Sequence, residues 1–298
     1  MPVQQPHLFS VVIPALNEGD LLRMTVESIL SATEYPDYEV LVVNDGSTDG
    51  SVDILDHRDP RVRVLRGGGL GVARARNLGA RHSRGEYIAF IDAHCRVSSN
   101  WLCELAQTLV AADVGLVGPC FTKLEQPEPR GCGMSWTDYT LDPAWFEPKD
   151  GHGPYEVPLS TGACQVFRRT TFYDLGCYDE GFLRWGFEDV EICLRAWLLG
   201  YRVVVNPRAT VAHYFRQSRN YEVDDLEITY NFLRMIHMHF SAPRIRRILR
   251  AVRANPLLPE ALTRLYQGDI FQLRAELHAA RVHDDDWFFQ QVNQPLAS

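Results

Sequence analysis

The sequence predicts an α/β fold, with a mostly parallel sheet flanked by helices and a helical extension at its C-terminal end. Short apolar runs that suit buried strands alternate with segments of helical spacing as far as residue 92. From residue 221 onward the apolar residues recur at helical spacing alone. We therefore divide the chain into an α/β domain over residues 1–220, which carries the candidate site, and an extension over residues 221–298.

The N-terminal third contains four predicted strands and two predicted helices. The strand segments are apolar, rich in β-branched residues and bounded by turn formers, whereas the helical segments have apolar residues three or four apart. We expect strands at 8–13, 38–43, 62–65 and 88–91, and helices at 21–30 and 70–82. Since parallel strands end at one edge of a sheet, the polar residues after them should gather there.

The pattern changes after Phe121. Residues 125–158 are rich in Pro, Gly and aromatic residues and have no clear period, which predicts a long binding loop or lid. We expect strands again at 163–168 and 201–205, with a helix at 190–199 between them.

The composition excludes some functions and restricts others. A formal net charge of −8 argues against a general nucleic-acid binder, and no apolar run is long enough to span a membrane. Residues 1–7 lack the pattern of a secretory signal. The seven cysteines are odd in number and form no Cys-x-x-Cys pair, so we expect free, buried thiols in a reduced, cytoplasmic protein. An anionic ligand would need a local cation, supplied by a metal or by arginines.

A candidate metal site follows the strand at 88–91. Asp92 and His94 point the same way along an extended chain, at an edge where ligands bind in α/β sheets. His213 ends another apolar stretch and would complete a set of three ligands. Two imidazoles and a carboxylate suit Mn²⁺ or another first-row ion better than Ca²⁺. The alternative is a turn-forming Asp with surface histidines.

Two further segments suit a nucleotide. Asp45 follows the second strand and is placed to accept hydrogen bonds from a base or a ribose, although a capped turn would explain it equally well. The glycine-rich segment 67–71 opens a helix that carries Arg74 and Arg76 in its early turns. Free backbone N–H groups and guanidinium groups there suit a phosphate or a flat ring, unless both arginines are simply solvated.

The densest group of candidate site residues is Trp185, Gly186, Glu188 and Asp189, with Glu188 and Asp189 as the candidate catalytic residues and Trp185 as part of the donor-binding wall. An aromatic ring, a glycine and two carboxylates suit a binding wall with a general base. The alternative is structural, because helix N-termini favour negative charge.

Six motifs occur between residues 9 and 216 in an order that resembles the nucleotide-sugar glycosyltransferases of the GT-A fold. The resemblance is to family 2 enzymes and, in the second half, to polypeptide N-acetylgalactosaminyltransferases and chondroitin-polymerase-like enzymes. The motifs are Val11-Val12-Ile13-Pro14-x-x-Asn17-Glu18, Val43-Asn44-Asp45-Gly46-Ser47-Thr48-Asp49-Gly50, Ala75-Arg76-Asn77, Asp92-Ala93-His94, Trp185-Gly186-x-Glu188-Asp189 and His213-x-Phe215-Arg216. The extension from Tyr221 is not covered.

The resemblance implies a sugar-nucleotide donor, most often UDP-linked, and a metal, Mn²⁺ or Mg²⁺, on its diphosphate. Pro14 and Glu18 would line the nucleotide pocket, Asp45 would hold the base, and Arg74 or Arg76 would lie near the uracil or the phosphates. The metal would be bound by Asp92, His94 and His213, in an Asp-x-His arrangement where many members have Asp-x-Asp.

The acid pair decides the expected stereochemistry. Retaining relatives with this set of metal ligands usually have Glu-Asn at the acid pair, whereas this chain has Glu188-Asp189. A carboxylate can take the acceptor's proton in an in-line displacement and an amide cannot, so we predict inversion with Asp189 as the general base. The alternatives are retaining, N-acetylgalactosaminyltransferase-like transfer to a peptide, a nucleotidyltransferase, or an inactive sugar-nucleotide-binding module. Peptide, glycan, lipid-linked and small-molecule acceptors all stay open.

A basic amphipathic segment lies within the extension at residues 243–253. It would suit peripheral contact with the inner face of a membrane or with a lipid-linked acceptor. The alternative is a helix packed on the α/β domain with its arginines in solvent.

Overall fold

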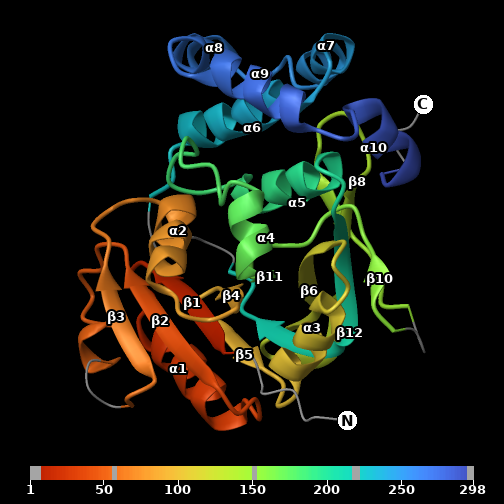
Figure 1. The fold of residues 1–298 in the computed structure, drawn as a ribbon. Helices are drawn as coiled ribbons and strands as arrows, with labels where there is room; N and C mark the ends of the chain where they lie inside the picture. The colour runs from red at the N-terminus through yellow and green to blue at the C-terminus, as the bar shows by residue number, and fades with distance from the viewer. Residues whose placement is uncertain (1–7, 56–58, 150–152, 217–221, 294–298) are drawn as a thin grey trace.

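The computed structural model describes residues 8–55, 59–149, 153–216 and 222–293. Their central feature is a mixed sheet with the strand order β10-β12-β6-β11-β4-β1-β2-β3, flanked by helices on both faces (Figure 1). The strands are β1 Phe9–Ala15, β2 Tyr38–Asn44, β3 Val62–Arg66, β4 Tyr87–Ile91, β5 Cys95–Val97, β6 Val114–Lys123, β7 Gln126–Gly131, β8 Met134–Trp136, β9 Pro143–Trp145, β10 Tyr155–Glu156, β11 Cys164–Arg168 and β12 Arg202–His213. The predicted fold class is confirmed.

The four N-terminal strands β3, β2, β1 and β4 are parallel, as expected from the sequence. In the β1–β2 register Ala15 pairs with Asn44, so both strands end at the same level. The backbone N–H of Asp45 donates to the carbonyl of Ala15 at 2.9 Å and continues this alignment one residue further. The candidate residues that follow these strands therefore share one edge of the sheet.

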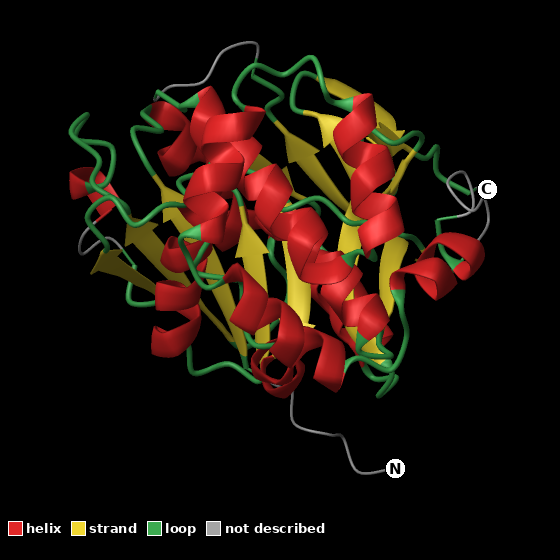
Figure 2. Cartoon of the chain, turned by 90° about the horizontal axis from the view of Figure 1, so that it is seen from above, coloured by secondary structure: helices red, strands yellow, loops and turns green. Residues whose placement is uncertain are grey.

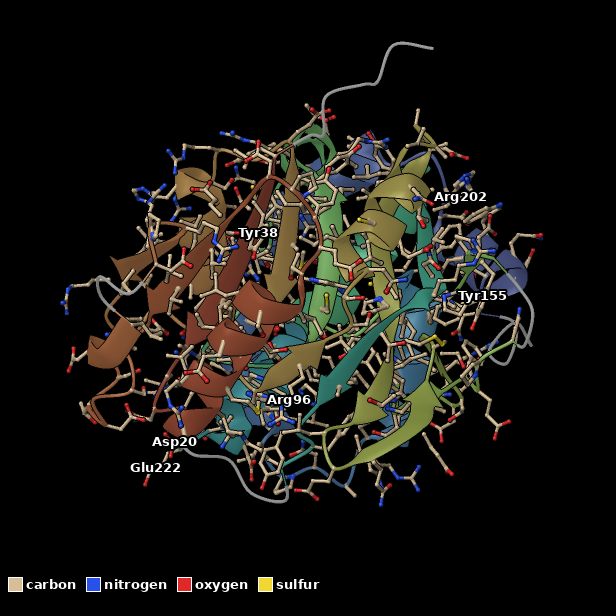
Figure 3. The ribbon with its side chains drawn as sticks, turned by 90° about the horizontal axis from the view of Figure 1, so that it is seen from below. Asp20, Tyr38, Arg96, Tyr155, Arg202 and Glu222 are labelled. Carbon is tan, nitrogen blue, oxygen red and sulfur yellow. A yellow bond between two sulfur atoms is a disulfide. The ribbon has the colours of Figure 1, made fainter. Side chains whose placement is uncertain are left out.

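Alternate residues of the central strands pack on opposite faces of the sheet. In β1, Val12 belongs to a buried cluster with α2 (Val72–His82) and α5 (Glu188–Leu198), whereas Val11 and Ile13 pack against α1 (Asp20–Ala32) and α3 (Trp101–Leu109). Helices cover the sheet in the view from above (Figure 2), and the view from below shows α1, which begins at Asp20, beside β2, which begins at Tyr38 (Figure 3). Strands buried on both faces read as continuous apolar runs, which explains why they were recognisable in the sequence.

The expectation of an irregular loop at 125–158 is wrong in part. Within the described residues of this region, β7 pairs with β6, β8 pairs with β9, and β10 pairs with β12. These strands are two to six residues long. Segments this short show too few residues for a period of two to be visible in the sequence.

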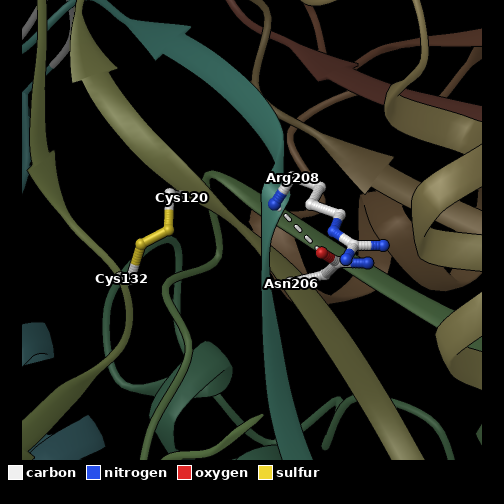
Figure 4. The surroundings of a disulfide bond; sticks show 4 residues. All are labelled: Cys120, Cys132, Asn206 and Arg208. Carbon is white, nitrogen blue, oxygen red and sulfur yellow. Dashed lines mark hydrogen bonds between the residues drawn. A yellow bond between two sulfur atoms is a disulfide. The ribbon is translucent and has the colours of Figure 1, made fainter. Parts of the chain in front are cut away.

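A disulfide joins Cys120 of β6 to Cys132, two residues before β8 (Figure 4). The prediction that all seven cysteines are free is therefore wrong for this pair, because the β6–β7 hairpin brings together two cysteines that are 12 residues apart. The same figure shows the turn in β12 where the Arg208 N–H donates to Asn206 Oδ1 at 3.0 Å. Disulfides persist in oxidising surroundings, so this pair does not support the predicted cytoplasmic location. Only the remaining cysteines support that location, and it stays a prediction.

Helices follow residue 221, as predicted, and they stack above α5 (Figure 1). They are α6 Asp225–His239, α7 Ala242–Ala251, α8 Leu258–Tyr266, α9 Ile270–Ala280 and α10 Asp285–Gln291, and the short α4 Arg169–Asp174 lies beneath them. One buried cluster runs from Val12 in β1 to Leu233 in α6 and Phe288 in α10. The predicted boundary at residue 220 lies outside the described residues, and the division into two parts stays a proposal.

The basic segment 243–253 forms most of α7, and Ile248 on its inner side is buried. Arg244 donates to Asp285 at 3.0 Å and to Asp286 at 2.7 Å, and Arg247 donates to the Tyr139 hydroxyl at 3.0 Å. Two of the five arginines thus have protein partners, and the helix packs on its neighbours. Among the described residues, no helix combines the length and the apolar character needed to cross a membrane.

Candidate active site

Two adjacent pockets open at the carboxyl ends of β1 and β4. The first, which we call the strand-end pocket, has a volume of about 170 Å³ and is lined by Pro14, Glu18, Asp45, His94 and Arg184 among others. The second, the aromatic pocket, has a volume of about 390 Å³ and includes Trp136, Trp145, Phe215, Glu188 and Asp189 in its walls. Asp92 and Trp185 line both pockets and mark the place where they meet.

Asp92, His94 and His213 converge at this junction, as the sequence predicted. Asp92 Oδ2 lies 3.6 Å from Nε2 of His213 and 3.9 Å from Nε2 of His94. The pairing of β5 with β12 brings the two histidines together, because His213 is aligned with Cys95, the residue after His94. One ligand atom from each of the three residues lies within 4.8 Å of the others, which suits a single divalent ion.

The protonation of these groups also suits a metal. Burial favours the neutral form of Asp92, but the neighbouring His213 and the charge of Arg76 outweigh it and hold the pKa of Asp92 well below its ordinary value. Burial lowers the pKa of His213, which favours the neutral form of its imidazole. An ionised carboxylate beside a neutral imidazole is the state in which both groups bind metals.

Glu18 lies behind the metal-site histidine. Its Oε2 atom is 3.2 Å from Nδ1 of His94, and the same carboxylate is paired with Arg216. A carboxylate at Nδ1 favours the tautomer with its N–H on that side, and Nε2, which faces Asp92, is then the nitrogen placed to bind a metal. Glu18 therefore has a second role besides lining the strand-end pocket.

The two predicted arginines of α2 have different surroundings. Arg76 is buried and donates to Glu188 at 2.9 Å, to Asp92 at 3.1 Å and to the Gly162 carbonyl at 2.8 Å. Arg74 is exposed, and its Nε donates to the carbonyl of Glu180 at 2.8 Å. Arg76 thus connects the metal-site carboxylate with the acid pair, whereas Arg74 points to the surface.

The acid pair begins α5 and faces the aromatic pocket. Burial, together with the neighbouring charge of Asp189, raises the pKa of Glu188 to about 7. Burial also raises the pKa of Asp189, although its Oδ2 accepts a hydrogen bond from the Gly162 N–H at 2.7 Å. A Cβ at position 162 would lie 2.8 Å from Cβ of Asp189, so glycine is required there.

Asp45 is part of the wall of the strand-end pocket and also supports the start of α2. Its carboxylate accepts hydrogen bonds from the N–H groups of Leu70 at 2.6 Å and Gly71 at 2.8 Å. Gly71 has a φ of 84°, and a Cβ there would lie 2.9 Å from the Arg184 backbone. The glycine-rich segment therefore lets α2 approach the loop that carries Arg184 and Trp185.

Some residues of the site were missed by the sequence analysis. Arg184 lines the strand-end pocket, and Gly162 contacts both Arg76 and Asp189. Arg184 stands one residue before the Trp185 motif, so its position could have been noticed. Gly162 has no local signal, because its partners are far away along the chain.

Comparisons with known proteins identify the family of the chain. The model of the family "Glycosyl transferase family 2" matches residues 10–176, and a model described as "N-terminal domain of galactosyltransferase" matches residues 149–218. Probable N-acetylgalactosaminyltransferase 8 of Caenorhabditis elegans is 35% identical over 51% of this chain and 39% of its own length. O-antigen biosynthesis protein RfbC of Myxococcus xanthus is 32% identical over 73% of this chain and 18% of its own length. The chain thus spans well under half of these relatives.

Solved structures share the fold. A structure of GalNAc-T7 with UDP, GalNAc and Mn²⁺ matches 97% of this chain and 57% of that chain, with a TM-score of 0.80 and 22% identity. The mannosyltransferase PcManGT from Pyrobaculum calidifontis, in complex with GDP-Man and Mn²⁺, matches with a TM-score of 0.58 and 21% identity over 94% of this chain and 87% of that one. The family model alone covers more than half of the residues, and the chain belongs to glycosyl transferase family 2.

Proposed function

We propose that this chain is a metal-dependent glycosyltransferase that moves a sugar from a nucleotide-sugar donor, UDP-linked, to an acceptor hydroxyl. The observation that carries the proposal is the position of Asp92, His94 and His213 at the junction of two pockets. A metal bound there would neutralise the charge that develops on the nucleotide diphosphate as the bond to the sugar breaks. We expect Mn²⁺, because two imidazoles and one carboxylate suit a first-row ion.

The strand-end pocket is the proposed donor site. Pro14, Glu18 and Asp45 line it at the carboxyl ends of parallel strands, where nucleotides bind in α/β sheets. Arg184 also lines this pocket, and its guanidinium forms an ion pair with Glu227, with Nε 3.2 Å from Oε2. A guanidinium group at that position supports binding of an anionic diphosphate by a chain whose net charge is −8.

The aromatic pocket is the proposed acceptor site, with Asp189 as the general base. Asp189 lies in its wall and is partly exposed to it, whereas Glu188 is buried and paired with Arg76. Asp189 would take the proton from the acceptor hydroxyl as that oxygen attacks the donor sugar. Attack from this side, opposite the diphosphate, inverts the anomeric centre.

A second candidate is retaining transfer to a peptide. It is favoured by relatives named polypeptide N-acetylgalactosaminyltransferase, of which the human form 10 is 32% identical over 72% of this chain and 39% of its own length. Glycan, lipid-linked and small-molecule acceptors remain alternatives within the inverting proposal.

The test is a donor screen with Mn²⁺ present, with hydrolysis and transfer measured for each UDP- and GDP-sugar. We expect one UDP-sugar to be consumed and the anomeric configuration of the product to be inverted, as read by NMR. A retained configuration would move the assignment to the second candidate. Transfer that survives both EDTA and His94→Ala would rule out the metal site, and a lack of any sugar release would leave only a nucleotide-binding module or a nucleotidyltransferase.

A further inference from the structure

Two buried asparagines of the C-terminal extension contact the walls of the aromatic pocket. Asn231 lies in the middle of α6, and Asn293 follows the end of α10. Neither side chain is exposed to solvent. Because burying an amide is unfavourable unless its polar atoms are hydrogen-bonded, the partners of each amide indicate what it does.

Asn231 holds the loop that connects the two pockets. Its Nδ2 lies 2.7 Å from the Leu183 carbonyl and 3.1 Å from the carbonyls of Trp185 and Gly186. Its Oδ1 accepts a hydrogen bond from the Leu183 N–H at 2.8 Å. One side chain from α6 therefore fixes the backbone on both sides of Trp185, the tryptophan that lines both pockets.

This loop has a backbone that needs such support. Arg184 has a φ of 35°, Gly186 a φ of 105° and Phe187 a φ of 73°. Non-glycine residues with positive φ are strained, and they persist where the surrounding structure holds them. The third of these, Phe187, is the residue before Glu188, and its ring packs against Phe232 of α6 with the centroids 5.6 Å apart. α6 thus supports the strained segment that leads into the acid pair.

Asn293 holds another part of the wall of the aromatic pocket, in a different way. Its Oδ1 accepts a hydrogen bond from the Trp136 N–H at 3.0 Å, and its Nδ2 donates to the Trp136 carbonyl at 3.0 Å. The amide pairs with both backbone groups of one residue, as a neighbouring strand would. Trp136 ends β8, and Figure 1 shows α10 beside that strand.

Further contacts join the extension to the same wall. The ring of Trp136 meets those of Phe240, Phe288 and Phe289, with centroids 6.0 to 6.1 Å apart. Ile228 of α6 lines the aromatic pocket directly. Both walls of the pocket are therefore attached to helices that lie outside the region matched by the family models, which end at residue 218.

We propose that the C-terminal helices α6–α10 are the element that shapes the acceptor pocket, with Asn231 and Asn293 as positioning residues. The proposal rests on the assignment of the aromatic pocket to the acceptor. The two asparagines should affect different pockets. Asn231 holds Trp185, which lines both pockets, whereas Asn293 holds Trp136, which lines only the aromatic one. Loss of Asn293 should affect the acceptor alone, and loss of Asn231 should affect the donor as well.

The experiment compares Asn293→Ala and Asn231→Ala with the matched control Asn255→Ala in the full chain. Asn255 is a half-buried asparagine of the same extension that donates to Thr229 at 3.1 Å, and it follows α7. Hydrogen exchange measured by mass spectrometry reports on the loops, calorimetry with UDP and Mn²⁺ reports on the donor pocket, and KM and kcat are measured on a panel of p-nitrophenyl glycosides. If the alanine variant does not fold, the isosteric Asn293→Asp replaces it in these measurements, because it retains the hydrogen-bond acceptor atom and loses the donor.

We expect Asn293→Ala to increase exchange at residues 134–136 by about tenfold, the effect of losing one or two hydrogen bonds, with the rest of the chain unchanged. It should raise the acceptor KM by a similar factor while UDP binding and kcat stay within about twofold. Asn231→Ala should increase hydrogen exchange at residues 183–187, weaken UDP binding and lower kcat.

Two results would overturn the proposal: exchange at residues 134–136 and 183–187 that rises as much in Asn255→Ala as in the two test variants, or local exchange that rises without any change in acceptor KM. If no panel glycoside is an acceptor, exchange and UDP binding still decide between local and general effects. A wild-type chain that neither cleaves nor transfers any donor sugar would instead refute the proposed function.

Discussion

Nδ1 of His94 lies 3.2 Å from Oε2 of Glu18, so one ring nitrogen of a metal-site histidine is held by a carboxylate. Arg216 pairs with the same carboxylate and holds it in place. The effect is to orient the ring with Nε2 toward Asp92, at 3.9 Å. A histidine fixed in this way loses less freedom when it binds a metal and is a stronger ligand.

Glu18→Ala should therefore weaken Mn²⁺ binding by about 10- to 100-fold, the usual effect of removing a group that orients a metal ligand. Calorimetric titration of the chain with MnCl₂ measures this directly. The control is Glu27→Ala, an exposed glutamate of α1 that is paired with Arg23. Equal Mn²⁺ affinity in the two variants would show that Glu18 lines the pocket without supporting His94.

Asp189→Asn should reduce turnover by at least ~100-fold, because an amide cannot take the acceptor's proton. The Gly162 N–H donates to Oδ2 at 2.7 Å and the Val190 N–H donates to Oδ1 at 2.8 Å, so the amide of the same size loses one of these two hydrogen bonds, and the fold and UDP binding should be retained. The exposed Asp174 of α4 provides the control Asp174→Asn. Near-normal turnover with Asp189→Asn would contradict the assignment of the base and favour the retaining reaction.

As the pH is lowered, the activity should be lost at an unusually high pH for a reaction that depends on a carboxylate. Burial raises the pKa of Asp189 above its ordinary value of 3.8, and burial with the charge of Asp189 raises that of Glu188 to about 7. A base works only when it is deprotonated, so kcat/KM should rise with pH through this raised range. A pH profile of kcat/KM for the acceptor, with Mn²⁺ saturating, measures the midpoint. A midpoint near pH 4 would mean that neither carboxylate limits the reaction.

The sequence was sufficient for the parts of the site that depend on strand ends. Asp45 and Asp92 could be placed because each follows an apolar run, and parallel strands end at one edge. His94 followed from its spacing to Asp92. His213 was proposed because it ends an apolar stretch and belongs to a motif, whereas the pairing of β12 with β5 that brings it to Asp92 has no local signature.

The two arginines of α2 show where the sequence was insufficient. Arg74 and Arg76 are two residues apart, and two helical steps turn the side chain by about 200° around the axis. One must face the sheet when the other faces solvent, yet charge and spacing do not reveal which. The surrounding carboxylates Glu188 and Asp92, far away along the chain, decide it.

The C-terminal extension shows a second reason why the sequence was insufficient to predict the site. Asn231 and Asn293 look unremarkable in the sequence, where an asparagine among apolar residues reads only as a poor helix former. Their partners, Trp185 and Trp136, are 46 and 157 residues away. Such contacts depend on how the helices stack, and local pattern does not carry that information.

Arg76→Met should destabilise the chain by about 3–5 kcal/mol, because it leaves the buried carboxylate of Glu188 without its counter-charge. The matched control is Arg74→Met on the same helix, where an exposed side chain is lost and the change should stay within about 0.5 kcal/mol. Urea unfolding at pH 7.5, followed by fluorescence, gives both values. Similar stabilities for the two variants would show that the Arg76–Glu188 pair adds nothing to the fold.

The last prediction concerns a buried carboxylate outside the site. Glu191 of α5 is fully buried, accepts a hydrogen bond from Arg195 Nε at 2.9 Å and lies 2.6 Å from Nε2 of His239. Burial alone would raise its pKa, but the charge of Arg195 and the hydrogen bond with His239 outweigh burial and lower the pKa to about 2. The charged form is therefore favoured by folding.

A folded-state pKa below the ordinary 4.5 means that the stabilisation is fully present above pH 4.5 and is lost as the pH falls toward 2. The shift corresponds to about 3 kcal/mol of unfolding free energy across that range. Urea unfolding of the wild type and Glu191→Gln should be measured at pH 6 and at pH 3. The difference between their free energies of unfolding should be smaller at pH 3. Glu27→Gln, at an exposed position, should show no such change, and a gap of constant size for Glu191→Gln would mean that its effect comes from packing and not from charge.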